Sequence, residues 1–280
     1  MYAETKVANR PDDPAPGVPE AVSGDQVRFT VLGPLEVVKD GTDHAPTTPK
    51  VLQLLAMLVL HPGKVVHIDS IIQELWAGDP PRSVRPTMHT YVYHLRRYVR
   101  EIGLTNDSET VLLTKPPGYL LRIDPAQVDV FTFQQHCHQG RELLRQCRYS
   151  EAARCFQLAM GLWSGAPLAN VQCGPMLSAC VVDLIEQRRS AQHLRIEAEI
   201  AGGMHRELIG ELRSLVAANP LDEGLNGQLM RVLGRSGRRS DAMASFRQLR
   251  NRLHAELGVE PCDELQLLHH ELLSEGEKTA

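Results

Sequence analysis

Apolar and polar side chains begin to alternate near residue 27, and this is the first regular pattern in the chain. Four apolar positions share one face of an extended segment: Phe29, Val31, Leu35 and Val37. Gly33-Pro34 interrupts the run, so the pattern predicts a short strand pair that ends in a turn at 39–41. Residues 1–26 carry four prolines and few large apolar side chains, and we expect a disordered tail there.

Three helical patterns follow this strand pair. Residues 49–61 are strongly apolar and stop at Pro62-Gly63, as expected of a buried helix, and residues 69–76 carry an apolar stripe at helical spacing. The third helix runs over 83–102, with Ser83 at its N-cap position and Pro86 in its first turn. Its predicted inward face consists of Val84, Met88, Tyr91, Val92, Leu95, Val99 and Ile102.

Two short apolar runs close this part of the chain. Residues 111–114 and 119–123 flank the turn Lys115-Pro116-Pro117-Gly118, which predicts a β-hairpin. Two helices with a short connection followed by a hairpin are typical of a winged helix-turn-helix, in which the hairpin is the wing. We therefore expect a DNA-binding domain of mixed α and β structure over 27–124.

From Asp129 onward the pattern is almost entirely helical and contains a loose repeat. Residues 149–156 match 239–246, with a weaker copy at 205–212, and Glu207 lies 34 positions before Asp241. This spacing favours a tetratricopeptide-like helical domain over 129–273, although an ordinary helical bundle is the alternative. Small residues are expected where paired helices approach (Ala152, Ala242, Gly210), and larger ones between the pairs (Phe156, Leu212, Phe246). The predicted fold class is mostly α.

The charge distribution adds a functional hypothesis. The formal net charge of −4 excludes a uniformly basic protein, yet residues 80–100 contain five arginines and no Asp or Glu. A solvated basic helix face is the simplest explanation, but this face lies on the second helix of a helix-turn-helix and therefore favours double-stranded DNA. The base-reading candidates are Arg85, Thr87, His89 and Thr90. The backbone candidates are Lys50, Arg82, Tyr93, Arg96, Arg97, Arg100, Thr114 and Lys115.

Several other classes of function lack support in the sequence. No apolar run is long enough to span a membrane and no signal peptide is recognisable, so we expect a cytoplasmic, nucleoid-associated protein. His136-Cys137-His138 with Cys147 matches no closed zinc pattern, and Cys173 and Cys180 are expected to be buried thiols. No catalytic constellation or phosphate-binding glycine loop is present, which predicts a protein that is not an enzyme and uses no cofactor or metal.

An ordered series of segments resembles the Streptomyces antibiotic regulatory protein family. The segments are FTVLGPLEV (29–37), KVLQLLAMLVLHPGKVV (50–66), IIQELWAGDPP (71–81), TMHTYVYHLRRYV (87–99), TKPPGYLL (114–121), VDVFTFQQ (128–135), LWSGAPLANV (162–171) and LGVEPCDELQLLH (257–269). Two positions depart from the family pattern. His67 stands where a small hydroxyl residue usually caps the second helix, and Pro86 stands at a position of the recognition helix that is commonly polar.

The resemblance implies a pathway-specific transcriptional activator of an antibiotic or secondary-metabolite gene cluster. Such activators combine an OmpR-like winged helix with a bacterial transcriptional activation domain. They bind direct repeats near the promoter −35 element as tandem protomers or dimers and recruit RNA polymerase holoenzyme. The expected polymerase-contact loop consists of Ala77, Gly78, Asp79, Pro80 and Pro81.

Two alternatives to an activator are also compatible with a winged helix followed by helices. One is a helical-repeat scaffold whose winged helix contacts protein, and the other is a response-regulator output domain. No receiver domain precedes Phe29, which disfavours the second.

Overall fold

The computed structural model describes residues 27–104 and 108–274. The chain begins with an antiparallel sheet of order β1-β2-β3, formed by Arg28–Thr30, Glu36–Lys39 and Thr42–Asp43. Phe29 pairs with Val37, and the four alternating apolar positions predicted from the sequence are all buried. The third strand was not predicted, because two exposed residues after a turn carry no hydrophobic pattern.

Three helices pack beside this sheet. They are α1 (Pro49–Val59), α2 (Ile68–Trp76) and α3 (Val84–Glu101). Every residue of α1 from Val51 to Val59 is buried, as its continuous apolar run predicts. Ser83 occupies the N-cap position of α3, but its side chain makes no capping hydrogen bond, so only the position was predicted correctly.

The wing belongs to a second sheet of three strands rather than to an isolated hairpin. Its order is β4-β6-β5, formed by Val65–His67, Gly118–Leu121 and Leu112–Lys115. A Cβ on Gly118 would lie 1.9 Å from the carbonyl oxygen of Val66, so the close pairing of β6 with β4 requires glycine there. Val111, predicted to begin a strand, instead ends the short helix α4 (Ser108–Val111).

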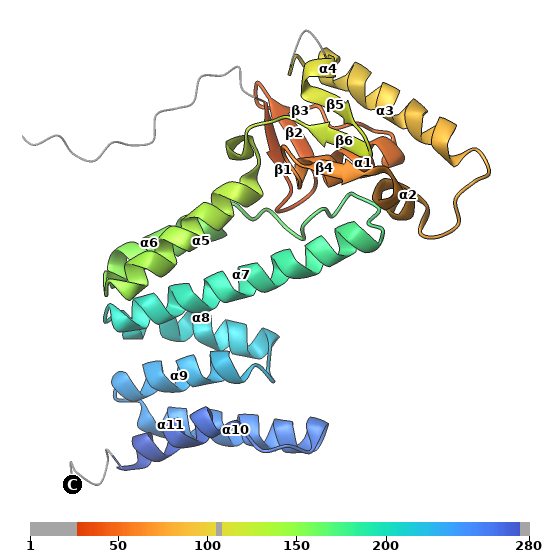
Figure 1. Ribbon diagram of the computed structural model, residues 1–280. Coiled ribbons are helices and arrows are strands. Elements are labelled where there is room, and N and C mark those ends of the chain that lie inside the picture. The colour runs from red at the N-terminus through yellow and green to blue at the C-terminus, as the bar shows by residue number, and fades with distance from the viewer. Residues whose placement is uncertain (1–26, 105–107, 275–280) are drawn as a thin grey trace, which may run out of the picture.

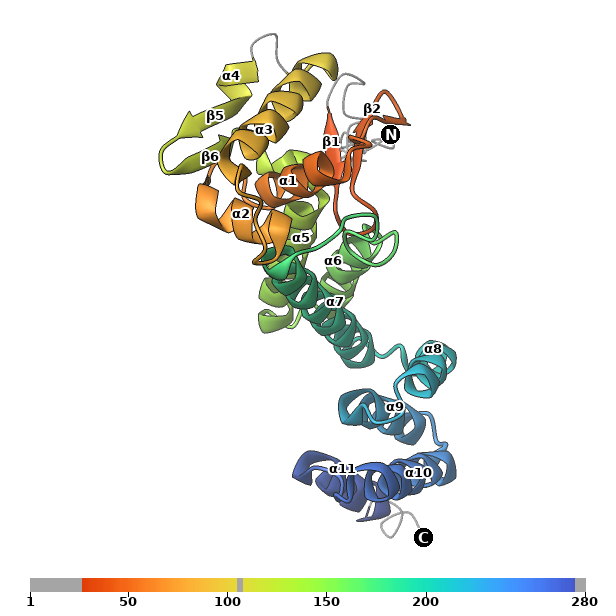
Figure 2. The ribbon, with the colours of Figure 1, turned by 90° about the vertical axis from the view of Figure 1, so that its right-hand side faces the viewer.

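The remainder of the described chain is helical. After the 3₁₀ turn Pro125–Gln127 come α5 (Asp129–Arg145), α6 (Tyr149–Met160), α7 (Pro175–Ala201), α8 (His205–Ala218), α9 (Glu223–Arg235), α10 (Arg239–Leu257) and α11 (Asp263–Ser274). The three copies of the sequence repeat form the first turns of α6, α8 and α10. In both views the stack from α8 to α11 forms the end of the molecule farthest from the winged helix (Figures 1 and 2).

The repeat residues follow the prediction with one exception. Phe156, Leu212 and Phe246 are buried between helices, and Ala152 and Ala242 are fully buried where helices approach. Gly210 is exposed, with open space around the position of a Cβ, so it permits no close approach. The prediction was wrong because Gly210 aligns with the exposed Arg154, whereas the buried equivalent of Ala152 is Leu208.

The hydrophobic core does not divide at residues 124–129. One buried cluster runs from Val27, just before β1, to Ala198 in α7, and a second runs from Ile196 to Leu272. Both Oδ atoms of Asp129 accept hydrogen bonds from backbone N–H groups in the bend between β1 and β2, those of Val31 and Leu32. The winged helix is therefore packed into the first helices of the helical domain.

A second polar joint connects α2 to α7. Glu74 is 1% exposed, and its carboxylate accepts hydrogen bonds from the backbone N–H groups of Gly174 at 2.6 Å and Met176 at 2.7 Å. These N–H groups lie at the start of α7, where they have no partner within the helix and where the helix dipole favours a negative charge. The side-chain amide of Gln53 donates to the Glu74 carbonyl at 2.9 Å, which joins α1 to the same point.

Two remaining features concern the burial of the cysteines and the apolar character of the helices. Cys173 and Cys180 are half-buried, not buried as predicted, because they flank the exposed first turn of α7. Within the described ranges, no helix combines the length and the apolar character needed to cross a membrane.

Candidate DNA-binding surface

The outward face of α3 carries a continuous basic strip. Its inner face is set by Met88, Val92, Leu95 and Val99, which are all buried. Beside this buried face, a polar or charged residue recurs every three or four positions, which places these residues on one strip of the helix. The strip consists of Arg85, His89, Tyr93, Arg96 and Arg100.

The wing is attached to this strip at two points. The Arg96 guanidinium donates to the hydroxyl of Thr114 at 2.8 Å and to the carbonyl of Leu112 at 3.3 Å, both in β5. The Tyr119 hydroxyl in β6 lies 3.2 Å from Nδ1 of His89. Burial raises the pKa of the Tyr119 hydroxyl, so the phenol keeps its proton at this contact. Helix and wing are thereby fixed as one surface before any ligand binds.

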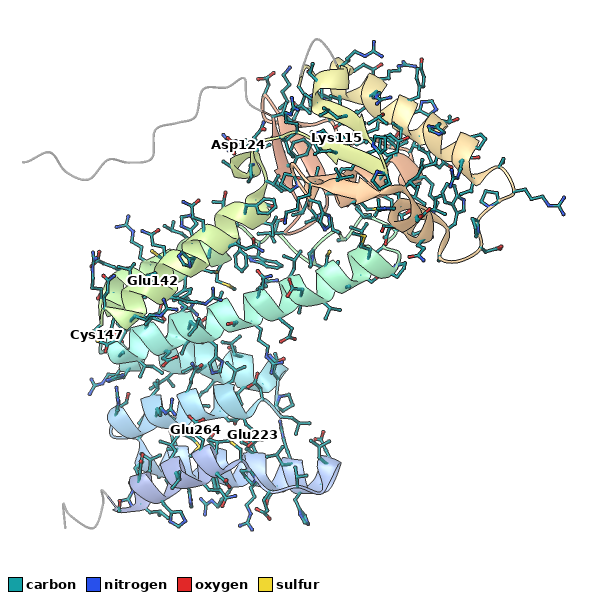
Figure 3. The ribbon with its side chains drawn as sticks, viewed as in Figure 1. Lys115, Asp124, Glu142, Cys147, Glu223 and Glu264 are labelled. Atoms are coloured by element: carbon teal, nitrogen blue, oxygen red, sulfur yellow. The ribbon has the colours of Figure 1, made fainter. Side chains whose placement is uncertain are left out.

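Three cations on this surface are available for an anion. Arg82, Arg85 and Arg100 are exposed, and within the described part of the chain none of them has an ion pair or side-chain hydrogen bond. Lys115 is exposed at the tip of the wing, where its pairing with Gly118 closes the hairpin (Figure 3). Free arginine and lysine side chains on a convex ridge are suited to phosphate groups.

Two further arginines have protein partners. Arg97 forms an ion pair with Glu101, with 2.7 Å between Nε and Oε1, and this hydrogen bond raises the pKa of Arg97. Arg96 uses Nε and Nη2 toward the wing, which leaves Nη1 with no hydrogen bond in the described chain. Arg96 therefore positions the wing and also retains donors for a phosphate.

Other predicted residues lie off the strip. Thr87 is half-buried about 160° around the helix from Arg85, and its hydroxyl donates to the carbonyl of Ser83 at 2.9 Å. The hydroxyl of Thr90 donates to the carbonyl of Pro86 at 3.2 Å. Lys50 is turned into the protein, where its ammonium contacts the carbonyl of Leu75 and the side chain of Gln53. The structure thus brings together Arg85, His89, Tyr93, Arg96 and Arg100, but not Lys50 or Thr87.

The connection between α2 and α3 is exposed from Ala77 to Pro81. Ala77 ends α2 in the left-handed conformation at φ 48°, and Gly78 follows at φ 95°. The chain therefore leaves α2 abruptly and crosses the surface beside the basic strip. Because Glu74 and Leu75 are held by α7, Gln53 and Lys50, the loop begins from a fixed point.

Sequence reasoning missed three residues whose contacts shape this surface or its surroundings. Glu101 reduces the free charge of the strip, Tyr119 attaches the wing, and Glu74 fixes the start of the loop. Only Glu101 had a visible signal, since it lies four residues after Arg97 on a predicted helix. The partners of Tyr119 and Glu74 are distant in sequence, so no local pattern reveals them.

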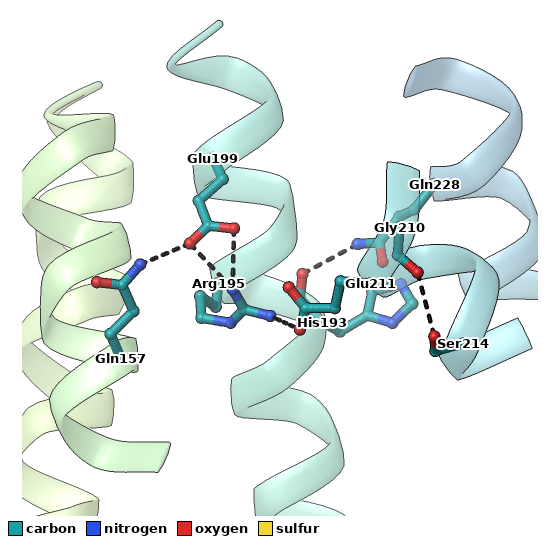
Figure 4. Close-up of polar contacts among 8 residues, drawn as sticks. All are labelled: Gln157, His193, Arg195, Glu199, Gly210, Glu211, Ser214 and Gln228. Carbon is teal, nitrogen blue, oxygen red and sulfur yellow. Dashed lines mark hydrogen bonds and ion pairs between the residues drawn. The ribbon is translucent and has the colours of Figure 1, made fainter. Parts of the chain in front are cut away.

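The helical domain contains a polar network centred on the buried carboxylate of Glu199. The Glu199 carboxylate accepts hydrogen bonds from Arg195 at 2.9 Å and from Gln157 at 2.8 Å, while Arg195 also contacts Glu211 (Figure 4). These residues come from α6, α7 and α8, so the network joins three helices where the two hydrophobic clusters meet. Among the described residues, no group of three or more His, Cys, Asp or Glu side chains is placed to hold a metal ion.

Comparison with known proteins identifies both parts of the chain. Residues 128–273 match the bacterial transcriptional activator domain, and residues 42–121 match the C-terminal domain of transcriptional regulatory proteins. The chain is 35% identical over 250 residues to regulatory protein DnrI of Streptomyces peucetius, covering 88% of this chain and 92% of that protein. The chain belongs to the Streptomyces antibiotic regulatory protein family.

Other members of this family extend the comparison. Transcriptional regulatory protein MoaR1 of Mycobacterium tuberculosis is 35% identical over 258 residues, with 92% of this chain and 82% of that protein covered. The solved structure of M. tuberculosis EmbR in complex with a low affinity phosphopeptide superposes with a TM-score of 0.84 at 32% identity. It covers 89% of this chain, which spans 65% of the EmbR chain.

Family membership establishes the general class of function. The protein is a transcriptional regulator with an N-terminal winged helix and a helical activator domain, and it is not an enzyme. The winged-helix domain implies DNA binding.

Proposed function

We propose that this family member activates transcription by binding direct repeats near a promoter −35 element and recruiting RNA polymerase holoenzyme. Tandem protomers would bind through the helix at 83–102 and the wing at 111–123. The controlled genes would form an antibiotic or other secondary-metabolite cluster. The family resemblance supports this proposal, and so does the basic strip of α3 attached to its wing.

The observation that carries DNA binding is the distribution of unpaired charge. Arg82, Arg85 and Arg100 are exposed and without ion pairs in the described chain, and no acidic residue lies between 80 and 100. A protein-binding face does not need a strip of one sign, whereas a phosphate backbone does. Arg85, His89 and Thr90 lie near the N-terminus of α3, the part of a recognition helix that reaches base edges.

Salt-dependent binding tests this assignment. Replacing the two unpaired backbone candidates Arg82 and Arg100 together by Ala should weaken binding to all DNA sequences and lower the slope of log K against log salt by up to about two. The measurement is fluorescence anisotropy with a labelled promoter duplex at several salt concentrations. Arg206→Ala is the matched control, because Arg206 is equally exposed but lies on α8. If the double variant binds with the affinity of the parent at every salt concentration, α3 is not part of the DNA interface.

Footprinting upstream of neighbouring genes and transcription in vitro test the finer proposal. Two protected direct repeats adjoining the −35 element are expected. Asp79→Ala in the loop Ala77–Pro81 should leave the footprint unchanged and lower transcript yield, because the loop lies beside the DNA surface and is fixed by α2. Protected repeats with full transcript yield from Asp79→Ala would exclude Asp79 as a polymerase contact.

A further inference from the structure

A groove in the second half of the helical domain lies on elements other than α3 and the wing. It has a volume of about 430 Å³ and lies between the C-terminal half of α8, the middle of α9 and one side of α10. This volume is within the range of pockets that accept ligands. Helical-repeat proteins use the concave surfaces formed by successive repeats to bind extended partners.

The floor of the groove is apolar and its rim is polar. Val216, Leu229 and Leu249 provide the apolar floor. Ala217, Ala244 and Ser245 line the sides, and their small side chains leave room for a peptide backbone between α8 and α10. Gln248 is exposed along the same side of α10, and within the described chain its amide has no hydrogen-bond partner. An exposed amide can both donate to and accept from a peptide bond.

The charge of the rim is positive. Arg213 and Arg252 line the groove, and Asp241 is the acidic residue among the lining side chains. Asp241 already receives hydrogen bonds from Arg238 at 2.9 Å and from Arg213 at 3.2 Å, so two cations offset its charge. Arg252 has no ion pair in the described part of the chain. The groove therefore has surplus positive charge at Arg252.

We propose that this groove binds an extended acidic peptide of a protein partner, with aliphatic side chains on the floor and carboxylates at Arg213 and Arg252. An extended segment alternates its side chains between two directions, so a sequence of alternating acidic and aliphatic residues suits an apolar floor beneath a cationic rim. The proposal is independent of the DNA surface, because the groove lies on α8, α9 and α10 while DNA binding is assigned to α3 and the wing.

The test uses the full chain and two synthetic probes. One probe is a fluorescein-labelled decapeptide of alternating Glu and Leu with an amidated C-terminus, and the other has Lys in place of Glu. Fluorescence anisotropy should show saturable binding of the Glu/Leu peptide that weakens with salt, and binding of the Lys/Leu peptide at least tenfold weaker.

Arg252→Glu should weaken binding of the Glu/Leu peptide at least tenfold. Arg247→Glu is the matched control, because Arg247 is exposed on the same helix but does not line the groove, and it should change binding less than twofold. Circular dichroism and DNA affinity should be unchanged in both variants. Failure of the parent protein to bind, equal binding of both peptides, or equal effects of the two variants would each overturn the proposal.

Discussion

At the scale of single residues, Glu101 opposes the charge of the DNA-binding surface. It lies one turn after Arg97, and both side chains of this ion pair are more than half exposed. DNA must compete with the carboxylate for Arg97. We therefore predict that Glu101→Gln binds DNA more tightly at low salt than the parent and has a salt slope steeper by up to about one.

The same salt titration checks this prediction, with Glu256→Gln on the distant helix α10 as control. An affinity of Glu101→Gln equal to or below that of the parent would show that Arg97 makes no contact with the duplex.

Asp129 gives the fold a pH dependence. Burial raises the pKa of its carboxyl group to about 6, against the opposing hydrogen bonds from backbone N–H groups of Leu32, Val31 and Val130. The folded protein therefore holds this proton more tightly than the unfolded chain, whose Asp129 titrates near pH 4. The resulting stabilisation is fully present below pH 4 and is lost as the pH rises through 6, and it amounts to at most about 3 kcal/mol.

Urea unfolding of the parent and of Asp129→Asn between pH 4 and pH 8 measures this contribution. The difference in unfolding free energy between the two proteins should change across pH 4–6 and be constant above pH 7. A difference that does not vary with pH would contradict the raised pKa.

At the scale of secondary-structure elements, the contact between α2 and α7 fixes the start of the loop Ala77–Pro81 relative to the helical domain. A Cβ on Gly174 would lie 2.3 Å from the carbonyl oxygen of Glu74, so the two chains meet too closely for any other residue. We predict that Gly174→Ala lowers the free energy of unfolding by about 1–3 kcal/mol, because backbone must move to accept the methyl group.

Gly165→Ala is the control, since its added Cβ has nothing within 4 Å and its φ is not positive. It should change stability by less than about 0.5 kcal/mol. Thermal unfolding followed by circular dichroism compares the two variants. Equal midpoint temperatures would show that the contact between α2 and α7 has room for a methyl group.

The helices and strands that could be predicted from the sequence are those whose apolar spacing lies within a single element. The inner face of α3 follows from apolar residues at steps of three and four, and Met88, Val92, Leu95 and Val99 are buried as predicted. The pairing of β4 with the wing depends on contacts between Val66 and Tyr119, more than fifty residues apart, so no local pattern contains it. The attachment of Glu74 to the start of α7 was hidden for the same reason.

In the candidate site, too, local patterns could be predicted from the sequence and tertiary contacts could not. Charge and helical spacing identified Arg85, His89 and Arg96 on the outward face, because both properties are local. The position of Lys50 at the start of a helix did not show that it differs from the exposed cations. Its ammonium is turned toward Leu75 by packing between α1 and α2. Which side chains are free to bind DNA is decided by tertiary partners, and a single sequence does not contain them.

At the scale of the whole molecule, one of the two hydrophobic clusters crosses the boundary between the domains. The first cluster joins the winged helix to α5, α6 and α7 as far as Ala198, and the second joins the last turn of α7 to α8 through α11. Asn170 adds a pair of hydrogen bonds to Leu35, from the Leu35 N–H at 2.7 Å and to the Leu35 carbonyl at 3.1 Å. The unit that folds around the DNA surface therefore extends well beyond residue 124.

This arrangement predicts how the chain can be shortened. A fragment of residues 1–201 keeps the first cluster, the Asp129 joint and the Glu74 joint, so it should unfold cooperatively and bind a single DNA half-site with the affinity of the full chain. A fragment of residues 1–124 loses the partners of Val31, Leu35 and Glu74, and it loses the α5 to α7 part of the cluster in which Phe29 is 1% exposed. Uncovering a large apolar side chain and buried polar groups together costs several kcal/mol, which is comparable to the whole stability of a small domain. Thermal melts and anisotropy on both fragments measure the difference. A cooperative melt and full half-site affinity from residues 1–124 would show that the winged helix folds without the helical domain.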